Sequence, residues 1–256
     1  MKLSTHSVQN TSPWFVLRCV ISQLLGRSNQ VLQSYRSDRI SRVNLEQDLR
    51  VLVPQPQPLM FDVGANKGQT LAMFQRVFNK PVIHAFEPNK ALVEQTLCPV
   101  HRGNPDVVIN AAALGAESGS LTFHECENNE LSSFLTLEAS EQNPFKDKMV
   151  KASTTVPVWT LDQYVKERGL PQLDLLKIDT QGYDLHVLQG ACEQLKAGRI
   201  SLVMLEINFV PMYAGQPSFG EVDAFLREHG YALIDMYEKI YQDNRLAWCT
   251  GLYQRC

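Results

Sequence analysis

Short apolar runs alternate with helical stretches from residue 59 onward, and this alternation limits the possible folds more than any other feature. The runs expected as strands are residues 59–63, 82–86, 106–110, 173–178 and 200–206. Helices are expected at residues 69–78, 89–97, 160–168, 184–195 with a break near Gly190, and 219–228. Strand and helix in turn build a parallel sheet covered by helices, so the sequence predicts an α/β domain.

The last two expected strands, residues 231–236 and 246–253, follow each other with no helix between them. Two strands joined directly must pair antiparallel, because a parallel pair needs a long crossover. We therefore expect a mostly parallel sheet in which the C-terminal strand is reversed.

Residues 1–58 differ from this pattern and are predicted to be an N-terminal helical segment that ends in a Pro-rich linker. Prolines at 54, 56 and 58 cannot continue a helix. Apolar residues at 14, 17, 21 and 24 repeat at helical spacing, and the stretch is too short to span a bilayer. An amphipathic helix packed on the domain is expected, with membrane-surface contact or a poor signal sequence as alternatives.

Residues 59–256 are predicted to form the second domain, with an insertion at residues 115–157 where the alternation loosens. Residues 121–123 and 155–158 look like short strands around a polar segment at 125–148. An insertion of this size on an α/β scaffold usually carries substrate contacts or a lid.

The overall charge and the cysteines restrict the class of partner. The net charge is -3 and no Lys/Arg run occurs, so no footprint for nucleic acid is seen and a small-molecule partner is predicted. The six cysteines form no C-x-x-C pair, which favours free thiols in a reducing, cytoplasmic setting over a zinc site. A homo-oligomer is left open.

The segment at residues 61–68 has the form of a ligand-binding loop between a strand and a helix. Gly64 allows a sharp turn and close approach of a ligand, and Gly68 allows the helix to pack close to the strand. The first turn of that helix offers unpaired N–H groups. Glu87 ends the second strand, where a carboxylate can accept hydrogen bonds from both ribose hydroxyls of an adenosine. A nucleoside cofactor is predicted.

The charge of this loop selects among nucleoside cofactors. A dinucleotide needs G-x-G-x-x-G so that the backbone can crowd against pyrophosphate, whereas this loop has only Gly64 and Gly68. Asp62 would repel a pyrophosphate but suits the ammonium and sulfonium charges of S-adenosylmethionine. We therefore predict S-adenosylmethionine, and a nicotinamide-dependent oxidoreductase is the alternative that the missing glycine and the terminal hairpin disfavour.

Four segments together resemble the FkbM family of S-adenosylmethionine-dependent methyltransferases. They are residues 61–68, 85–89, 175–191 and 203–206, so the resemblance covers roughly residues 59–256. It implies a Rossmann-like class I methyltransferase with a seven-stranded, mostly parallel sheet and a reversed C-terminal strand. It also implies O-methylation of a small-molecule hydroxyl, often on a sugar or a polyketide-like product. Gln181 departs from the commoner glutamate, which keeps open a non-catalytic binding module with this fold.

The predicted catalytic residues are Asp179, Glu206 and Lys177. Asp179 ends a buried strand and is expected to act as a general base or to orient the donor's amino end, with a helix cap near Asp184 as the alternative. Lys177 suits a buried ion pair as well as a substrate contact. Glu206 ends the next strand, where a neighbouring carboxylate would raise one pKa. The two carboxylates would suit Mg²⁺, but no third ligand has convincing spacing and no metal site is predicted.

The remaining site predictions concern the donor and the acceptor. Cofactor contacts are predicted at Asp62, Gly64, Asn66, Gly68, Glu87, Pro88, Ala112 and Ala113. The two alanines fall where proteins of the resembled family pack adenine, although they suit the core equally. Substrate contacts are predicted at His124, Ser132 and Ser133. The resemblance favours the two serines facing the site, whereas composition alone indicates a loop.

Overall fold

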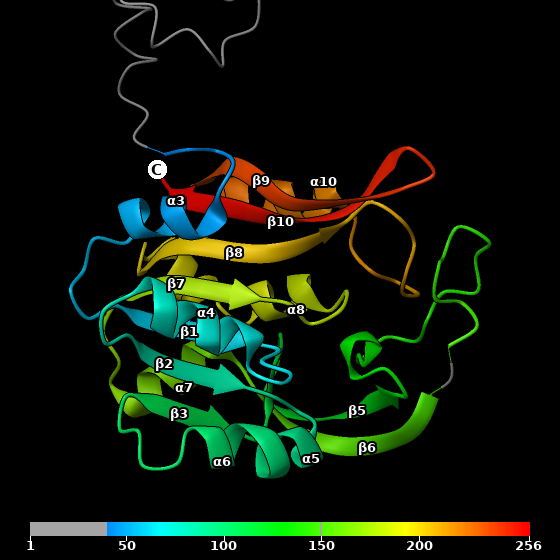
Figure 1. Cartoon of the computed structure of the whole chain (residues 1–256), viewed down its shortest axis with the longest axis horizontal. Helices are drawn as coiled ribbons and strands as arrows, with labels where there is room; N and C mark the ends of the chain where they lie inside the picture. Colours follow the sequence, from blue (N-terminus) through cyan, green and yellow to red (C-terminus); the bar gives the residue numbers. More distant parts are fainter. Residues whose placement is uncertain (1–39, 149) are drawn as a thin grey trace, which may run out of the picture. The chain divides into compact units, whose positions relative to one another are not determined.

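A seven-stranded sheet forms the centre of the fold (Figure 1). The structure, a computed structural model, describes residues 40–148 and 150–256, and the helix predicted at residues 14–25 lies outside them. The strand order is β3-β2-β1-β7-β8-β10-β9. The strands are β1 (Leu59–Val63), β2 (Val82–Phe86), β3 (Val107–Asn110), β7 (Leu173–Ile178), β8 (Ile200–Asn208), β9 (Tyr231–Gln242) and β10 (Arg245–Arg255).

Strand β10 is antiparallel to both of its neighbours, β8 and β9, while the pairs from β3 to β8 are parallel. The predicted seven-stranded sheet with a reversed C-terminal strand is therefore confirmed. The reversed strand lies inside the sheet, between β8 and the edge strand β9.

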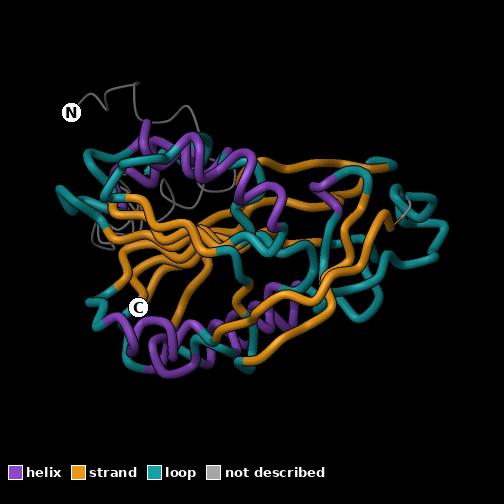
Figure 2. Tube along the Cα trace, turned by 90° about the horizontal axis from the view of Figure 1, so that it is seen from below, coloured by secondary structure: helices purple, strands orange, loops and turns teal. Residues whose placement is uncertain are grey.

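Helices cover both faces of this sheet, as the side view in Figure 2 shows. One face is packed by α3 (Leu45–Leu52), α4 (Gln69–Val77) and the continuous helical run α5 (Lys90–Leu92), η2 (Val93–Leu97) and α6 (Cys98–Val100). The other is packed by α7 (Leu161–Arg168), α8 (Asp184–Gln189), α9 (Cys192–Lys196) and α10 (Phe219–Glu228). Asn89 caps the second helical run, because its side chain accepts a hydrogen bond from the Leu92 amide at 3.2 Å.

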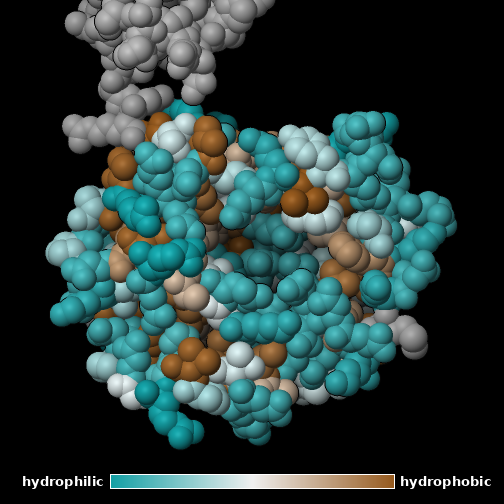
Figure 3. All heavy atoms as spheres, in the orientation of Figure 1, coloured by the Kyte–Doolittle hydropathy of each residue, from teal (hydrophilic) through white to brown (hydrophobic). Residues whose placement is uncertain are grey.

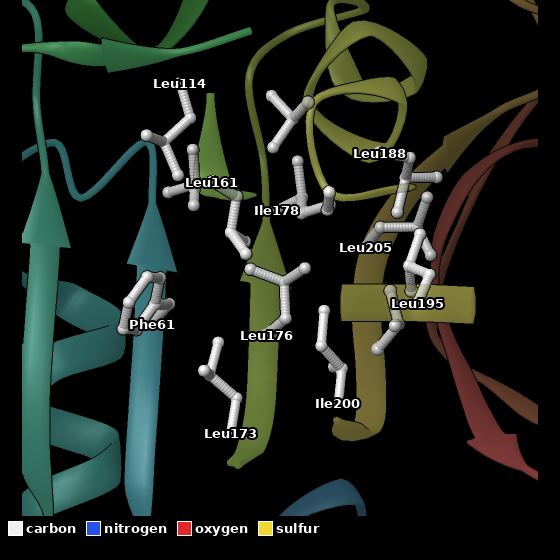
Figure 4. Close-up of a cluster of buried hydrophobic side chains, with 14 of the residues drawn as sticks. Phe61, Leu114, Leu161, Leu173, Leu176, Ile178, Leu188, Leu195, Ile200 and Leu205 are labelled. Atoms are coloured by element: carbon white, nitrogen blue, oxygen red, sulfur yellow. The ribbon is translucent and has the colours of Figure 1, made fainter. Parts of the chain in front are cut away.

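Alternation along each strand divides the core into two layers. In β7, Leu176 and Ile178 face α8 and α9, where Leu188 and Leu195 meet them (Figure 4), and Leu175 faces the opposite layer. This strand is buried on both faces, and its two charged residues are buried with partners: Asp174 accepts a hydrogen bond from the Leu59 amide, and Lys177 forms an ion pair with Asp62.

Helix α3 belongs to the same compact unit as the sheet. This unit comprises Arg42 to Cys256. Leu49 of α3 is fully buried in the layer that holds α4. The Asp48 carboxylate is also fully buried and accepts hydrogen bonds from the Tyr237 hydroxyl at 2.9 Å and the Arg42 amide at 2.8 Å. These bonds fasten α3 to strand β9.

The expected insertion forms a second, three-stranded sheet of order β4-β6-β5. It consists of β4 (Ala113–Leu114), β5 (Gly119–Cys126) and β6 (Val150–Trp159), with the short helix η3 (Asn129–Leu131) after β5. The two strands expected at residues 121–123 and 155–158 are thus longer than predicted and pair with each other antiparallel.

No helix within residues 40–148 and 150–256 is long and apolar enough to cross a membrane. The five cysteines in these ranges are all free, with Cys126 and Cys249 buried and Cys98 and Cys256 exposed.

Candidate functional site

A cavity of about 290 Å³ lies at the C-terminal ends of β1, β2, β7 and β8, where open α/β sheets place their ligands. Figure 3 shows a hollow on the face drawn in Figure 1, bordered largely by hydrophilic residues. Of the predicted site residues, the ones that line the cavity are Gly64, Asn66, Glu87, Pro88, Ala113, Ser132, Lys177, Asp179 and Glu206.

The turn after β1 is packed against the end of β7. Gly64 has φ +80°, and a Cβ atom built on it would lie 1.9 Å from the Asp179 carbonyl oxygen. A side chain is thus excluded by the protein's own backbone and not only by a ligand. Gly68, with φ +88°, starts α4 and lies against the Leu97 side chain outside the cavity lining.

Asp62 does not reach the cavity. Its side chain is fully buried beneath the turn and lies 2.8 Å from the Lys177 ammonium, measured from Oδ1 to Nζ. The two residues are register partners on the paired strands β1 and β7, so their side chains share one face of the sheet. Lys177 also donates to the Gly64 carbonyl at 2.8 Å. Of the two roles predicted for Lys177, the structure thus contains the buried ion pair.

The Lys177 ammonium is held in its charged form by the acids around it. Burial lowers the pKa of Lys177, but the Asp62 and Asp179 carboxylates more than reverse this, so its pKa lies above the usual value. The pair fixes the turn after β1 to the end of β7, and a single charged cluster therefore supports both sides of the cavity floor.

Glu87 lines the cavity at the end of β2. Its carboxylate accepts hydrogen bonds from the Asn66 amide at 2.7 Å and the Asn89 amide at 2.8 Å. Burial raises the pKa of Glu87 to about 7, and only 5% of the residue is exposed. Asn66 adopts the left-handed region, with φ +48°, which aims its amide at this carboxylate.

Asp179 and Glu206 face the cavity from adjacent strands. The Asp179 side chain is 39% exposed, and its Oδ2 lies 3.9 Å from the Lys177 ammonium. Helix α8 receives no side-chain cap, and the Asp184 carboxylate accepts from the Thr180 amide at 3.0 Å, so the turn after β7 is held without Asp179. Burial first, and then the nearby Asp179, raise the pKa of Glu206 to about 8.

Of the three insertion residues predicted to contact substrate, only Ser132 lines the cavity, and the insertion also contributes residues that were not predicted. Phe123 and Phe134 line the cavity, and their rings lie 5.2 Å apart between centroids. His124 does not line it, because alternation along β5 turns it away from the Phe123 side, and its Nδ1 lies 3.0 Å from the Ser153 hydroxyl. His124 is therefore a strand-pairing residue in this structure.

The two serines divide in the same way. Ser132 lines the cavity and accepts from the Cys126 amide at 3.0 Å. Ser133 is buried behind the lining and donates to the Gln181 carbonyl at 2.7 Å, which ties the insertion to the turn after β7. Ala112 is likewise buried outside the lining, next to Ala113, which is part of it.

Several lining residues were not predicted from the sequence. They are Val63, Ala65, Gln69, Thr70, Phe86, Leu114, Phe123, Asn129, Glu130, Phe134, Thr180 and Gln181. Gln69 and Thr70 begin α4, and the expected exposure of N–H groups there was a signal for them. Within residues 40–148 and 150–256, no group of three or more His, Cys, Asp or Glu residues is placed to hold a metal ion.

Comparison with known proteins places this site in a family. Residues 62–233 match the methyltransferase FkbM domain. The 2-O-methyltransferase NoeI of Sinorhizobium fredii is 23% identical over 183 residues, which are 69% of this chain and 74% of that protein. The 31-O-demethyl-FK506 methyltransferase FkbM of Streptomyces tacrolimicus is 25% identical over 207 residues, 73% of this chain and 77% of that protein.

A third relative comes from an archaeon. The hexuronic acid methyltransferase AglP of Haloferax volcanii is 25% identical over 173 residues, which are 66% of this chain and 65% of that protein. The domain match covers more than half of the chain and contains the turn after β1 and the ends of β2, β7 and β8. The chain belongs to the FkbM family of methyltransferases.

Proposed function

We propose that this protein transfers a methyl group from S-adenosylmethionine to a hydroxyl group of a small molecule, a sugar or a natural-product-like acceptor. The observation that carries the proposal is that Gly64 and Asp179 line the same cavity, with the turn after β1 packed against the Asp179 backbone. The turn proposed to bind the donor and the proposed base thus lie together at the C-terminal edge of the sheet. The O-methyltransferase relatives support the choice of a hydroxyl acceptor.

The residues present fit S-adenosylmethionine, whose positively charged sulfur carries the methyl group. Glu87 would accept hydrogen bonds from the ribose hydroxyls, and the Ala113 and Leu114 side would receive the adenine ring. Four carboxyl groups line the cavity, on Glu87, Glu130, Asp179 and Glu206, and one ammonium, on Lys177. This balance favours a cationic donor and opposes the pyrophosphate of a nicotinamide dinucleotide.

Asp179 is the proposed general base. It is the more exposed of the two carboxyl groups at the ends of β7 and β8, and its Oδ2 lies 3.9 Å from the Lys177 ammonium. Asp179 would accept the proton of a hydroxyl placed against it, and the cavity walls would hold that hydroxyl close to the bound donor, which would supply the methyl group. Lys177 itself is proposed to support this site through the ion pair with Asp62.

Methyl transfer in Asp179→Asn tests this assignment. Donor binding, measured by calorimetry with S-adenosylhomocysteine, should change little, while transfer of labelled methyl to a pool of sugars and natural products should fall about 100-fold or more. Glu167→Gln, which removes an exposed carboxylate on α7 outside the cavity, is the matched control. Absence of S-adenosylhomocysteine binding to the wild-type protein would rule out the proposed donor, and full activity in Asp179→Asn would rule out the base.

We also propose a cytoplasmic location, supported by the free cysteines in the described ranges. The exposed thiols of Cys98 and Cys256 would remain unpaired in a reducing compartment. Measuring protein thiols after extraction under acid trapping would test this, and a disulfide between any two cysteines would contradict it.

A further inference from the structure

Gln181 lines the cavity between two carboxyl groups, those of Asp179 and Glu206. Its Nε2 atom donates to Asp179 Oδ1 at 2.8 Å and lies 3.5 Å from Glu206 Oε1. The backbone of Gln181 is left-handed, with φ +54°, and its carbonyl accepts the Ser133 hydroxyl. A residue with an unfavourable backbone conformation is thus held by a second segment of the chain in a place where its side chain meets both acids.

The orientation of the Gln181 amide is set by Tyr213. The Tyr213 hydroxyl lies 2.7 Å from Gln181 Oε1 and is buried, with 1% of the residue exposed. The same hydroxyl lies 3.3 Å from the Leu131 carbonyl oxygen, so its single proton goes to the nearer acceptor, Gln181 Oε1. This donation leaves the Nε2 hydrogens to face the carboxyl groups. The reversed amide would direct its oxygen at the Asp179 Oδ1 atom, where acceptor would meet acceptor.

Glu206 is surrounded by more negative than positive charge. The charged and titratable groups that face it are Lys177 and Asp179 at the end of β7, Asp184 of α8, Tyr213 of the loop after β8, and Cys249 of β10. Its hydrogen-bond partner on its own strand is Asn208, whose Nδ2 donates to Oε1 at 3.1 Å. Two carboxyl groups that share one amide donor cannot both ionise without mutual repulsion.

We propose that Gln181 is a positioning residue: its amide, oriented by Tyr213, holds the Asp179 carboxyl group facing the cavity and leaves Glu206 to carry the proton. The proposal rests on the proposed methyl transfer for its role in the reaction, whereas the protonation states are properties of the protein alone. A glutamate at 181 would add a third acid to the pair. The neutral amide keeps the two roles apart.

The titration of Glu206 tests this directly and requires no acceptor. Carboxyl groups of glutamate labelled with ¹³C can be followed by NMR across the pH range, with the Glu206 signal assigned by its loss in Glu206→Gln. The midpoint should lie well above the ordinary range for glutamate, in line with a raised pKa of about 8. In Gln181→Glu it should rise by about one pH unit or more, because a like charge then contacts Glu206.

Two further variants distinguish the effect of a charge at position 181 from the effect of any added charge in the cavity. Gln69→Glu adds the same charge to the same cavity without any hydrogen bond to Asp179 or Glu206, and should move the Glu206 midpoint by about a third as much or less. Tyr213→Phe frees the amide to reverse and should raise the midpoint in the same direction as Gln181→Glu. Thermal melting of each variant checks that the fold is retained.

Equal midpoints in the wild-type protein, Gln181→Glu and Gln69→Glu would overturn the proposal, as would a Glu206 midpoint in the ordinary range. If Tyr213→Phe does not fold, the comparison of the two glutamate variants still decides. Failure of S-adenosylhomocysteine to bind refutes the proposed function and leaves the titration result standing, so the two failures are distinguishable. With an acceptor in hand, the acid limb of the pH profile for kcat/KM should move upward in Gln181→Glu, a shift that loss of structure alone would not produce.

Discussion

Replacing Gly64 by alanine should destabilise the protein, because the new side chain would clash with the Asp179 backbone and the left-handed conformation of residue 64 disfavours alanine. The new Cβ atom would lie 1.9 Å from the Asp179 carbonyl oxygen, whereas real Cβ atoms stay beyond 3.0 Å, so the turn or the end of β7 must shift by more than 1 Å. Crowding of this kind costs about 1–3 kcal/mol, and a left-handed backbone costs a further ~1–2 kcal/mol for an alanine. The sum is about 2–5 kcal/mol.

Gly103→Ala separates these two contributions. Gly103 has nearly the same φ, +78°, but nothing lies within 4 Å of a Cβ atom built on it, so it carries only the cost of the backbone conformation. At about 2–4 °C per kcal/mol for a domain of this size, calorimetry should give a Tm loss of roughly 4–20 °C for Gly64→Ala and ~2–8 °C for Gly103→Ala. Equal losses would refute the packing of Asp179 against the turn. S-adenosylhomocysteine affinity should fall in Gly64→Ala alone.

The remaining predictions concern the buried charges. Lys177→Met leaves the Asp62 carboxylate buried without its cation and should cost about 3–5 kcal/mol in urea denaturation. Adding Asp62→Asn should recover most of this, and a double variant no more stable than Lys177→Met would contradict the pairing. Glu87→Gln should weaken S-adenosylhomocysteine binding about tenfold or more, since a charged acceptor becomes neutral. In the wild-type protein the affinity for S-adenosylhomocysteine should increase as pH rises through about 7, because Glu87 ionises in that range. If calorimetry shows the same pH dependence in Glu87→Gln, Glu87 is not the group that binds the ribose. Because Glu87 and Glu206 have folded pKa values raised above 4.5, the folded state holds protons that the unfolded chain has released. The free energy of unfolding should therefore fall as pH rises from about 4.5 through 7 and 8. Glu206→Gln should make this fall less steep. An unchanged pH dependence in that variant would contradict the raised pKa of Glu206.

The local patterns of the sequence predicted the sheet and the place of the site. Apolar runs identified the parallel strands, and the absence of a helix before residue 246 predicted the reversed strand. Asp179 and Glu87 were expected at strand ends because a parallel sheet brings those ends to one edge. Each of these inferences needs only neighbouring residues and a general rule of sheet construction.

Local sequence patterns could not predict contacts between segments that are distant in the chain. The partner of Asp62 is fixed by the register of β1 on β7, and nothing in either strand alone states that register. The demand for glycine at 64 likewise comes from the Asp179 backbone. His124 was predicted as a substrate contact because it borders the polar insertion, but alternation counted from Phe123 places it on the other side of the strand.

Gln181 shows the same limit in another form. The sequence marks it only as a departure from the commoner glutamate, whereas its contacts with Tyr213 and Ser133 depend on two loops that the sequence leaves without regular structure. Glutamine at 181 has no charge, but in the fold it is hydrogen-bonded to Asp179, Tyr213 and Ser133.

The interior position of β10 has a consequence for how the protein forms during synthesis. Strand β9 is made before β10, yet its partner in the sheet is β10, so β9 cannot join the sheet until the later strand is in place. Until then the pairing edge of β8 is also open. Unpaired strand edges are sites of association between chains, so an incompletely folded chain that lacks β10 exposes both of them.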